Sequence, residues 1–526
     1  VTGSCHFLQA AGLNILVDCG MEQGNDVYEN QELPIAASDV DCILLTHAHI
    51  DHSGLIPLMY VNGFRGQVYS TSATAQLCEI MLRDSAHIQM FEAEWRNRKA
   101  ARSGGKLKEF VPLYDMDAAV NVCKQFVGCE YDRVYDIAEG IKIRFTDVGH
   151  LLGSASIEVW ATEKTENGDV TEKIVFSGDI GNINKPIIKD PKHVRDADYV
   201  VMESTYGNRS HGGTPNYVED LTDIFKRTFE RGGNVVIPSF AVGRTQELLY
   251  IIRKIKEDNL VGRDFDVYMD SPLAIEATNI FIKNVESCFD DEAVELVRKG
   301  INPLSFPGLK YATTGDESKQ INFDPNPKVI ISSSGMCEAG RIRHHLKHNL
   351  WRPECTIVFV GYQAVGTTGR IIVDGAEEIK LFGEPIQIKA EIVQLKGSSG
   401  HADKDGLLCW INAFDTKPKK VFVVHGEDSV CDEFTECLKE EYGYDAMAPY
   451  TGGSYDLIAD RVISEGVKER KTRRTTSTQR GKTVFDRLVA AGKRLMTVIT
   501  HNEGGTNKDL AKFTDQINAL CDKWDR

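Results

Sequence analysis

Hydrophobic residues alternate with turn-forming and polar residues along the first two hundred positions of the chain. Short β-rich segments such as "LNILVDCG", "DCILLTHAH" and "EKIVFSGDIGN" each end in polar residues at the carboxyl side. Side chains at strand ends leave the core without disrupting it, so layered sheet proteins often carry functional groups there. The same pattern predicts a helix over residues 74–102 and a hairpin turn at "KTENGDV".

A second pattern begins near Tyr206, where longer helical segments separate apolar strands. Helices are predicted over residues 216–230 and 246–258, and strands at "NVVIPS", "FDVYMDS", "KVIISSS" and "CTIVFVGY". This alternation is typical of a parallel sheet. Near Ile392 the short strands return, at "EIVQLKGSSGHAD" and "KVFVVHGED". We therefore expect a second domain inserted into the first.

The predicted organisation has four segments. They are a first domain over residues 1–206, an inserted domain over 207–394, the return of the first domain over 395–463, and a C-terminal extension over 464–526. The extension begins with "SEGVKERKTRRTTSTQRGK", which is basic and poor in apolar residues and predicts a linker. Apolar residues then follow at helical spacing, which predicts a docked amphipathic helix: Leu510, Phe513, Ile517, Leu520 and Trp524.

Composition limits the class of protein. The 526 residues suffice for more than one domain with a buried core. The formal net charge of −16 argues against a broad nucleic-acid-binding surface. A local basic groove, or divalent ions held by acidic residues, could still reverse the potential at one site.

Cysteine usage and hydropathy point to the cytoplasm. The 13 cysteines include no CxxC pair, and their odd number argues against a disulfide framework. No window of about eighteen apolar residues and no signal-peptide pattern occurs, so we expect a cytoplasmic protein without a membrane partner. Val1 lies inside what looks like a strand, so we expect a few residues to precede it.

The stretch "THAHIDHSGLIP", residues 46–57, carries an unusual density of coordinating side chains. His47 and His49 stand two apart, so they point the same way in an extended backbone, and Asp51 and His52 follow on the next turn. Imidazoles and carboxylates are the ligands of zinc-type sites, and two from each half could hold two ions side by side. A histidine-rich polar loop is the alternative, but such a loop has no structural reason for this density.

These residues form the motif HxHxDH, which resembles the signature of the metallo-β-lactamase superfamily. Further residues follow in that family's order: Asp18 in "LVDCG", His150 in "DVGHLLGSAS" and Asp179 in "FSGDIGN". A single aspartate before glycine is usually a turn former, so the resemblance depends on the ordered set.

The inserted domain narrows the resemblance to the β-CASP nucleases, which include the endonuclease subunit of the mRNA 3′-end cleavage factor and RNase J. The matching residues are Glu203 in "VMESTYGNR", His401 in "GSSGHADKDG" and His425 in "VFVVHGED", with "PSFAVGRTQELL", "DSPLA", "SSSGMCEAGR" and "GYQAVGTTGR" as further similar stretches. The resemblance covers residues 1–463. It implies an α/β fold: a four-layer αββα metallo-β-lactamase domain, an inserted parallel-sheet α/β β-CASP domain, and a C-terminal helical extension outside both.

The resemblance also implies a set of roles. One metal ion would take His47, His49 and His150, the other Asp51, His52 and His425, with Asp179 bridging them. The ions are expected to be two Zn²⁺, with Mn²⁺ as the alternative, and ions about 3.5–4 Å apart can hold a hydroxide and clamp phosphate oxygens. The residues implied in catalysis are His401 as general acid, Glu203 as its partner, Asp51, and Asp18, which would orient a ligand.

Substrate contacts are expected where predicted strands end with small residues ahead of a helix, because such turns offer backbone N–H groups to an anion. The candidates are Ser239, Arg244, Ser333, Gly335 and Arg341, with Lys396 as a further cation. An exposed arginine or lysine is more often simply solvated. In "RIRHHLKH", His344, His345 and His348 have a helical surface pattern that predicts packing or solvent exposure, and they are not expected to be ligands.

The sequence therefore predicts a zinc-dependent ribonuclease that hydrolyses single-stranded RNA by a two-zinc-activated hydroxide and leaves 3′-hydroxyl and 5′-phosphate ends. The histidine at the last motif, His425, indicates RNA, and the similarity to the cleavage-factor type favours endonuclease action. The alternatives are exonuclease action, a hydrolase of DNA or of a small ester, and a non-catalytic RNA-binding scaffold. A homodimer is also left open. A basic arm could add RNA affinity, with a solvated linker as the alternative: Lys468, Arg470, Lys471, Arg473 and Arg474.

Overall fold

The computed structural model describes most of the chain. The described residues are 3–22, 33, 35–102, 110–166, 168–210, 212, 216–395, 399–467, 480–502, 504 and 506–524. Lys396 and the predicted basic arm at residues 468–474 lie outside the described residues. The predictions made for them stay predictions.

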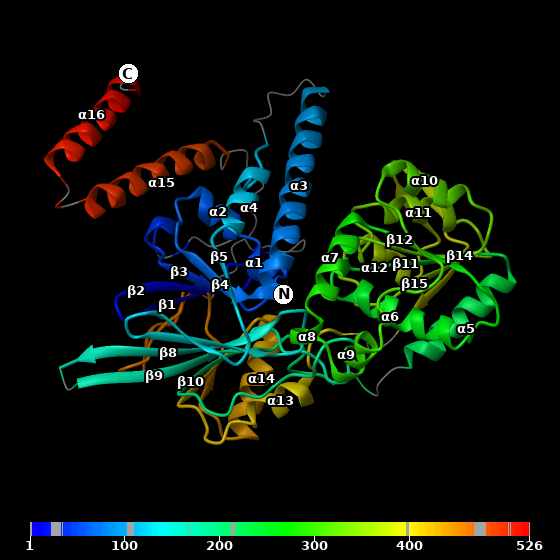
Figure 1. Ribbon diagram of the computed structural model, residues 1–526, viewed down its shortest axis with the longest axis horizontal. Helices are drawn as coiled ribbons and strands as arrows, with labels where there is room; N and C mark the ends of the chain where they lie inside the picture. Colours follow the sequence, from blue (N-terminus) through cyan, green and yellow to red (C-terminus); the bar gives the residue numbers. More distant parts are fainter. Residues whose placement is uncertain are drawn as a thin grey trace.

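Two sheets form the first domain (Figure 1). The first, in the order β1-β2-β3-β4-β5, contains β1 (His6–Ala10), β2 (Leu13–Val17), β3 (Cys42–Leu44), β4 (Gln67–Thr71) and β5 (Phe126–Cys129). The second, in the order β20-β19-β10-β9-β8-β7-β6, contains β6 (Val134–Ala138), β7 (Ile141–Asp147), β8 (Ala155–Thr165), β9 (Gly168–Phe176), β10 (Tyr199–Glu203), β19 (Lys420–Val424) and β20 (Ala446–Met447).

The alternation of side chains along each strand explains how these sheets stack. In β2, Ile15 and Val17 belong to the buried cluster shared by the two sheets, whereas Leu16 belongs to the cluster on the other face of the first sheet. Helices cover the outer faces, namely α2 (Ile56–Val61), α3 (Ser72–Arg102) and α4 (Met116–Cys123) on the first sheet and α13 (Lys404–Ile411) and α14 (Asp428–Glu440) on the second. The layers are helix, sheet, sheet, helix, as predicted.

The inserted domain is built on a parallel sheet of order β13-β12-β14-β11-β15-β18. Its strands are β11 (Val235–Pro238), β12 (Asp266–Asp270), β13 (Leu309–Tyr311), β14 (Lys328–Ser332), β15 (Thr356–Phe359) and β18 (Glu391–Gln394). Val235 and Ile237 pack on one face and Val236 on the other, so the strand is buried on both sides. The predicted parallel sheet is confirmed.

The remaining elements complete both domains. On the inserted domain, one face carries α5 (Tyr217–Glu230), α6 (Arg244–Glu257) and α7 (Pro272–Lys283), and the other carries α10 (Gly315–Phe323), α11 (Ile342–Asn349) and α12 (Thr368–Val373). Shorter elements are α1 (Ile50–Ser53), α8 (Val285–Cys288), α9 (Asp291–Arg298), the 3₁₀ helix η1 (Ala37–Asp39), and the hairpins β16 (Glu378–Leu381) with β17 (Glu384–Gln387) and β21 (Ser454–Asp456) with β22 (Arg461–Ser464).

The C-terminal extension differs from its prediction in two respects. The predicted terminal helix is present as α16 (Asn507–Trp524), but a second helix, α15 (Arg480–His501), precedes it. Of the five apolar residues expected to dock α16, Leu510, Phe513 and Ile517 are partly buried, whereas Leu520 and Trp524 remain 54% and 65% exposed. Helix α15 contacts the body near η1, where Thr497 donates a hydrogen bond to Asp39, and α16 extends away from the body (Figure 1).

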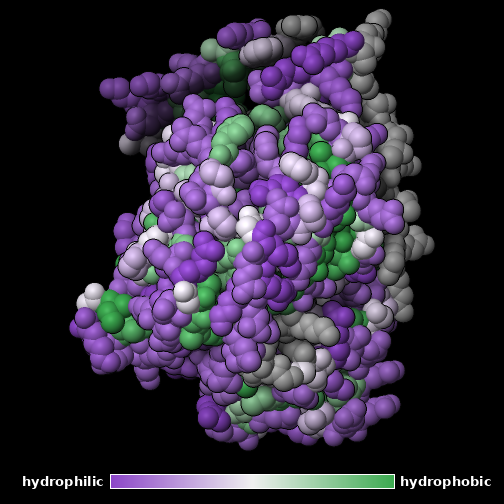
Figure 2. Space-filling model, turned by 90° about the vertical axis from the view of Figure 1, so that its right-hand side faces the viewer, coloured by the Kyte–Doolittle hydropathy of each residue, from purple (hydrophilic) through white to green (hydrophobic). Residues whose placement is uncertain are grey.

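The surface is polar on the side of the inserted domain. Seen from there, it is mainly hydrophilic, and its hydrophobic side chains form small separate groups (Figure 2). Among the helices that the structure describes, none combines the length and the apolar character needed to cross a membrane.

Candidate metal centre

The histidine-rich stretch changes backbone conformation halfway along. After β3 ends at Leu44, the chain remains extended through His49, which occupies the position just before α1. Asp51 and His52 then lie on α1. The carbonyl of His52 accepts a hydrogen bond from the backbone N–H of Cys19 at 2.7 Å, which fixes α1 against the end of β2. The two halves of the stretch therefore present their side chains from different directions.

The other candidate ligands come from neighbouring strand ends. His150, Asp179 and His425 follow β7, β9 and β19, whose carboxyl ends lie at the same edge of the second sheet. The turns carrying His150 and Asp179 approach each other closely, since a Cβ on Gly181 would lie 2.0 Å from the carbonyl oxygen of Gly149. Only glycine fits at position 181 without moving the His150 turn.

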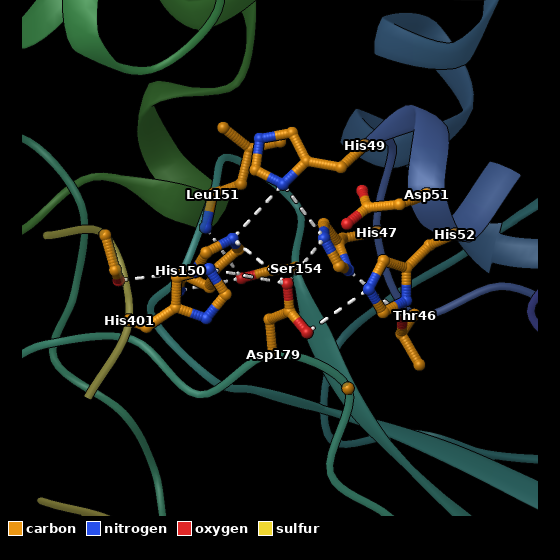
Figure 3. Close-up of polar contacts among 12 residues, drawn as sticks. Thr46, His47, His49, Asp51, His52, His150, Leu151, Ser154, Asp179 and His401 are labelled. Atoms are coloured by element: carbon orange, nitrogen blue, oxygen red, sulfur yellow. Dashed lines mark hydrogen bonds and ion pairs between the residues drawn. The ribbon is translucent and has the colours of Figure 1, made fainter. Parts of the chain in front are cut away.

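Asp179 lies at the centre of the imidazoles, and its two oxygens face different groups (Figure 3). Its Oδ2 lies 3.4 Å from Nε2 of His47 and 3.5 Å from Nε2 of His150. Its Oδ1 lies 3.2 Å from Nε2 of His52 and 3.3 Å from Nε2 of His425. The carboxylate of Asp179 thus lies between two groups of candidate ligands.

Candidate ligand atoms cluster within 4.8 Å of one another in three groups. These are His47, His49, His150 and Asp179; Asp51, His52 and His425; and Asp179, Glu203 and His401. The first two groups have the composition expected for two metal ions.

Unsatisfied buried atoms test whether a metal fits. Within the described chain, Nε2 of His52, Oδ1 of Asp179 and Nδ1 of His425 are buried without a hydrogen-bond partner. The 3.2 Å contact between His52 and Asp179 has ion-pair distance but not hydrogen-bond geometry. Such atoms are costly to bury without compensation, and divalent cations would provide it for Nε2 of His52 and Oδ1 of Asp179. On His425 the nitrogen that faces Asp179 is Nε2, at 3.3 Å. The donor set therefore fits divalent metal ions.

Burial and neighbouring charged groups shift the pKa values of the candidate ligands. Burial lowers the pKa of His49 to about 3, with His47 acting in the same direction, and burial also holds the pKa of His150 well below its ordinary value. Burial would raise the pKa of the Asp179 carboxyl, but the imidazoles of His52 and His425 outweigh it and hold the pKa well below its usual range. Neutral imidazoles at His49 and His150 beside an ionised Asp179 are the protonation states that metal binding requires. At His52, burial would lower the pKa, but the carboxylates of Asp179 and Asp18 outweigh it and raise the pKa well above its ordinary value, so a metal ion would have to displace a proton there.

Asp18 orients one of the imidazoles. It follows β2, is 2% exposed, and its Oδ2 lies 2.7 Å from Nδ1 of His52. Thr46 donates to the same carboxylate through its backbone N–H at 2.8 Å and through its hydroxyl. These bonds leave Nε2 of His52 directed at Asp179. Asp18 is therefore placed behind the ligand rather than among the ligand atoms.

His401 and Glu203 form a pair beside the centre. Nδ1 of His401 lies 3.2 Å from each carboxylate oxygen of Glu203, and its Nε2 lies 3.9 Å from Oδ2 of Asp179. Backbone N–H groups of Ile180 and Thr205 donate to Glu203 at 2.5 and 3.3 Å. Burial lowers the pKa of His401, but the carboxylates of Glu203 and Asp179 outweigh it and raise the pKa to about 9.

A cleft of about 630 Å³ adjoins this pair and is lined by both domains. Its walls include Ser399 and Ala402, which flank His401, and Lys185, Arg244 and Glu247. Arg244 stands at the start of α6 and lies 2.5 Å from Glu247. Of the five predicted substrate residues, Arg244 lines this cleft.

The other predicted substrate residues lie at the carboxyl edge of the inserted sheet. Ser239 is buried, and its backbone N–H donates to the carbonyl of Ser332. The hydroxyl of Ser333 donates to Ser271 at 2.9 Å, and Gly335 lies against the ring of Phe240. Ser239 is thus committed to internal contacts, and the predicted substrate contacts at Ser333 and Gly335 stay predictions.

Arg341 is held by internal acceptors. Its guanidinium donates to Oδ1 of Asp270 at 2.7 Å and to the carbonyls of Ala312 and Thr313 at 3.0 and 2.8 Å. These bonds use three of the five N–H donors of the guanidinium, and the side chain is 24% exposed. The expected contact at Arg341 therefore stays a prediction.

Two features of this region were not anticipated. His345 is fully buried, which is the packing alternative expected for it, but its bond to Asp270 was not anticipated. Lys185 and Glu247 meet across the two domains at 3.5 Å. Neither pair has a local motif, because the partners stand far apart in the chain, and "GNINKP" around Lys185 resembles an ordinary turn.

The layered fold and the converging histidines and aspartates define a metal-dependent hydrolase of the metallo-β-lactamase type. Three family models match the chain: a metallo-beta-lactamase superfamily domain over residues 7–182, a Beta-Casp domain over residues 245–372, and a Zn-dependent metallo-hydrolase RNA specificity domain over residues 385–449. The chain belongs to the β-CASP family of the metallo-β-lactamase superfamily.

Named relatives agree with this assignment. Ribonuclease TTHA0252 of Thermus thermophilus is 34% identical over 429 residues, which cover 81% of this chain and 91% of the relative. Transcription termination factor FttA is 32% identical in Methanosarcina mazei and 29% in Methanocaldococcus jannaschii, each match covering 85% of this chain and 68% of the relative. The predicted enzyme class, a metal-dependent hydrolase related to ribonucleases, is confirmed.

Proposed function

We propose that this protein is a ribonuclease that hydrolyses phosphodiester bonds of single-stranded RNA with two zinc ions, cuts internally, and leaves 3′-hydroxyl and 5′-phosphate ends. The observation that carries the proposal is the position of Asp179, whose two oxygens face two complete groups of ligands. A single tetrahedral ion would not need seven converging ligand side chains.

Divalent ions at the two groups would supply Lewis-acid stabilisation of the phosphate oxygens and lower the pKa of water. The chain's own residues supply the rest. Asp18 and Thr46 keep the ring of His52 oriented. Glu203, fixed by two backbone N–H groups, holds Nδ1 of His401 so that Nε2 faces the centre.

His401 is the proposed general acid. The carboxylate of Glu203 favours the protonated imidazole, so a proton is held on Nε2 beside the reacting phosphate. Transfer of this proton to the leaving 3′ oxygen would give a 3′-hydroxyl end, and the phosphate would remain on the 5′ end of the other product. We assign His401 to proton transfer and not to metal binding because its Nε2 lies 3.9 Å from Asp179, farther than the Nε2 atoms of the four histidines that face this carboxylate at 3.2–3.5 Å.

RNA is favoured as the substrate by the relatives and by the site. One relative is named a ribonuclease, and the last family model is described as an RNA specificity domain. The cleft beside His401 contains Lys185 and Arg244, which suit a phosphate-bearing strand.

The proposal is tested with purified protein on RNA, DNA of the same sequence and a lactone, followed by mapping of the cut ends and elemental analysis. We expect cleavage of RNA alone and about two zinc ions per chain. A circular form of the same RNA separates the modes of attack, because only an endonuclease can open it. Hydrolysis of the lactone or DNA without RNA cleavage would reject the proposed substrate, and RNA binding without cleavage would indicate a scaffold.

A further inference from the structure

The ammonium group of Lys185 lies beside the reaction centre. Lys185 follows β9, in the loop after Asp179, and its Nζ donates a hydrogen bond to the carbonyl oxygen of His150 at 2.8 Å. A Cβ on Gly400 would lie 3.4 Å from Cε1 of His150 and 3.9 Å from Nζ of Lys185. The ammonium group is therefore next to the residue that precedes His401.

The ammonium group of Lys185 is largely buried, and its protein contacts compensate only part of its charge. Its side chain is 10% exposed. The acidic partner, Glu247 at 3.5 Å, also binds Arg244 at 2.5 Å. The one carboxylate of Glu247 thus faces two cations, Lys185 and Arg244, while Asp403 and Asp405 line the cleft further along. A buried charge without full compensation is costly unless a ligand supplies the compensation.

The donor inventory leaves room for a ligand. An ammonium group has three N–H donors. Among the described residues, Lys185 has two acceptors, the carbonyl of His150 and the carboxylate of Glu247. One donor remains for an anion in the cleft. Glu247 and the His150 carbonyl hold Nζ in place before any ligand arrives, which reduces the entropy lost on binding.

The cleft connects this donor to the catalytic pair. Lys185 and Arg244 line it together with Ser399 and Ala402, on either side of His401. At about 630 Å³ it is large enough for an organic ligand rather than a single small ion. A strand in this cleft would therefore pass Lys185 and the residues on either side of His401.

We propose that Lys185 binds the RNA phosphate immediately 5′ of the scissile linkage. The inference rests on the proposed function, in which His401 protonates the 3′ oxygen of the upstream nucleotide. Lys185 lies on the His401 side of the centre, beside Gly400. It therefore faces the upstream part of the strand, and its charge-assisted hydrogen bond fixes that part for cleavage.

The test pairs a protein change with a substrate change. Lys185→Met is compared with the wild type on an RNA with one defined cut site, in which single linkages around the cut are replaced by neutral methylphosphonates. We expect Lys185→Met to lower kcat/KM about 10- to 100-fold on unmodified RNA. The methylphosphonate one linkage 5′ of the cut should lower the wild-type rate similarly, yet have little further effect on Lys185→Met.

Controls separate binding from structure. Lys185→Met should keep its metal content, and Lys185→Arg should restore part of the rate on unmodified RNA. Lys189→Met is a matched control in the same loop, because the ammonium of Lys189 binds the carbonyl of Ser287 and does not line the cleft. It should behave like the wild type on every substrate.

Failure of the proposed function and failure of the inference about Lys185 give different results. If the wild type cleaves no RNA, the proposed function fails and the inference fails with it. The other outcome is that the wild type cleaves RNA, but the rate loss from Lys185→Met multiplies with the rate loss from each methylphosphonate. The protein change and the substrate changes then act independently. In that case Lys185 contacts none of the replaced phosphates, and only the inference is wrong. Loss of metal from Lys185→Met would also reject it, since Lys185 would then support the His150 turn.

Discussion

Two sheet edges in this protein bury aspartate and histidine together, and they use them differently. In the inserted domain, Asp270 ends β12 and is fully buried. Its Oδ2 accepts hydrogen bonds from Ser318 at 2.5 Å and from His345 at 2.6 Å, and its Oδ1 accepts one from Arg341 at 2.7 Å. Every oxygen of this carboxylate has a protein donor, so the cluster is complete by itself.

At the edge of the first domain the same residue types remain incomplete. Nε2 of His52, Oδ1 of Asp179 and Nδ1 of His425 are buried without hydrogen-bond partners in the described structure. Burial alone therefore does not distinguish a metal centre from a structural cluster. The distinction is whether the buried polar atoms are satisfied by the protein, because unsatisfied atoms require a partner from outside.

Replacing the shared carboxylate should have the largest effect. Asp179→Ala removes the group that faces both sets of ligands, so we expect loss of both metal ions and of detectable RNA cleavage. Elemental analysis should fall from about two zinc ions per chain towards none. His425→Ala is the control, since it touches one set and should cost about one ion. A wild type with a single metal, together with an active Asp179→Ala, would show that the two sets do not form a paired centre.

Removing the proposed acid should affect rate without affecting metal. His401→Ala should keep both ions and its RNA affinity while cleavage falls roughly 10²–10⁴-fold, since a positioned general acid contributes that much. An RNA with sulfur in place of the scissile 3′ oxygen needs no proton to leave, so it should restore most of the lost rate. If this substrate is no better, or if the variant loses metal, His401 belongs to the ligands.

Breaking the hydrogen-bonded cluster around Asp270 should lower the stability of the fold and leave the metal centre intact. Asp270→Ala removes the carboxylate partner of the fully buried His345 and one of the three acceptors of Arg341, so we expect about 3–5 kcal/mol of destabilisation and a lower thermal midpoint. Metal content per folded chain should be unchanged. The measurement is thermal unfolding combined with elemental analysis. A loss of metal with unchanged unfolding would mean that the two edges are not independent.

The smallest effect is expected from a change at Asp18, which lies behind the ligand His52. Asp18→Asn keeps the size of the side chain but removes the charge that orients His52, so metal affinity should fall roughly 10–100-fold. Competition with a chelator measures this affinity. Asp41→Asn is a suitable control, because Asp41 is exposed and binds the backbone of Asn14 on the same sheet. Equal affinities for Asp18→Asn and the wild type would show that Thr46 alone orients the ring.

The parts of the fold that depend on local pattern could be predicted from the sequence. The period of apolar residues located α3, α5 and α6 to within two residues at each end. The spacing of His47, His49, Asp51 and His52 predicted two pairs of ligands for two ions, and the structure places the first pair before α1 and the second pair on it. The prediction missed α15, although only its first three residues belong to the basic segment and the rest carries apolar residues at helical spacing, among them Phe485, Leu488, Leu495 and Ile499.

By itself, the sequence determined which side chains have metal-binding chemistry, because ligand type and short-range spacing are properties of neighbouring residues. Only the tertiary structure decided which of the buried histidines and aspartates lack a protein partner. His52 and His345 look alike in the chain, yet one points an unpartnered nitrogen at Asp179 and the other is bonded to Asp270. The physical reason is that hydrogen bonds and ion pairs are satisfied across strands and domains that lie far apart in sequence. The pair Lys185 and Glu247 exists for the same reason, since folding alone brings the two domains together at the cleft.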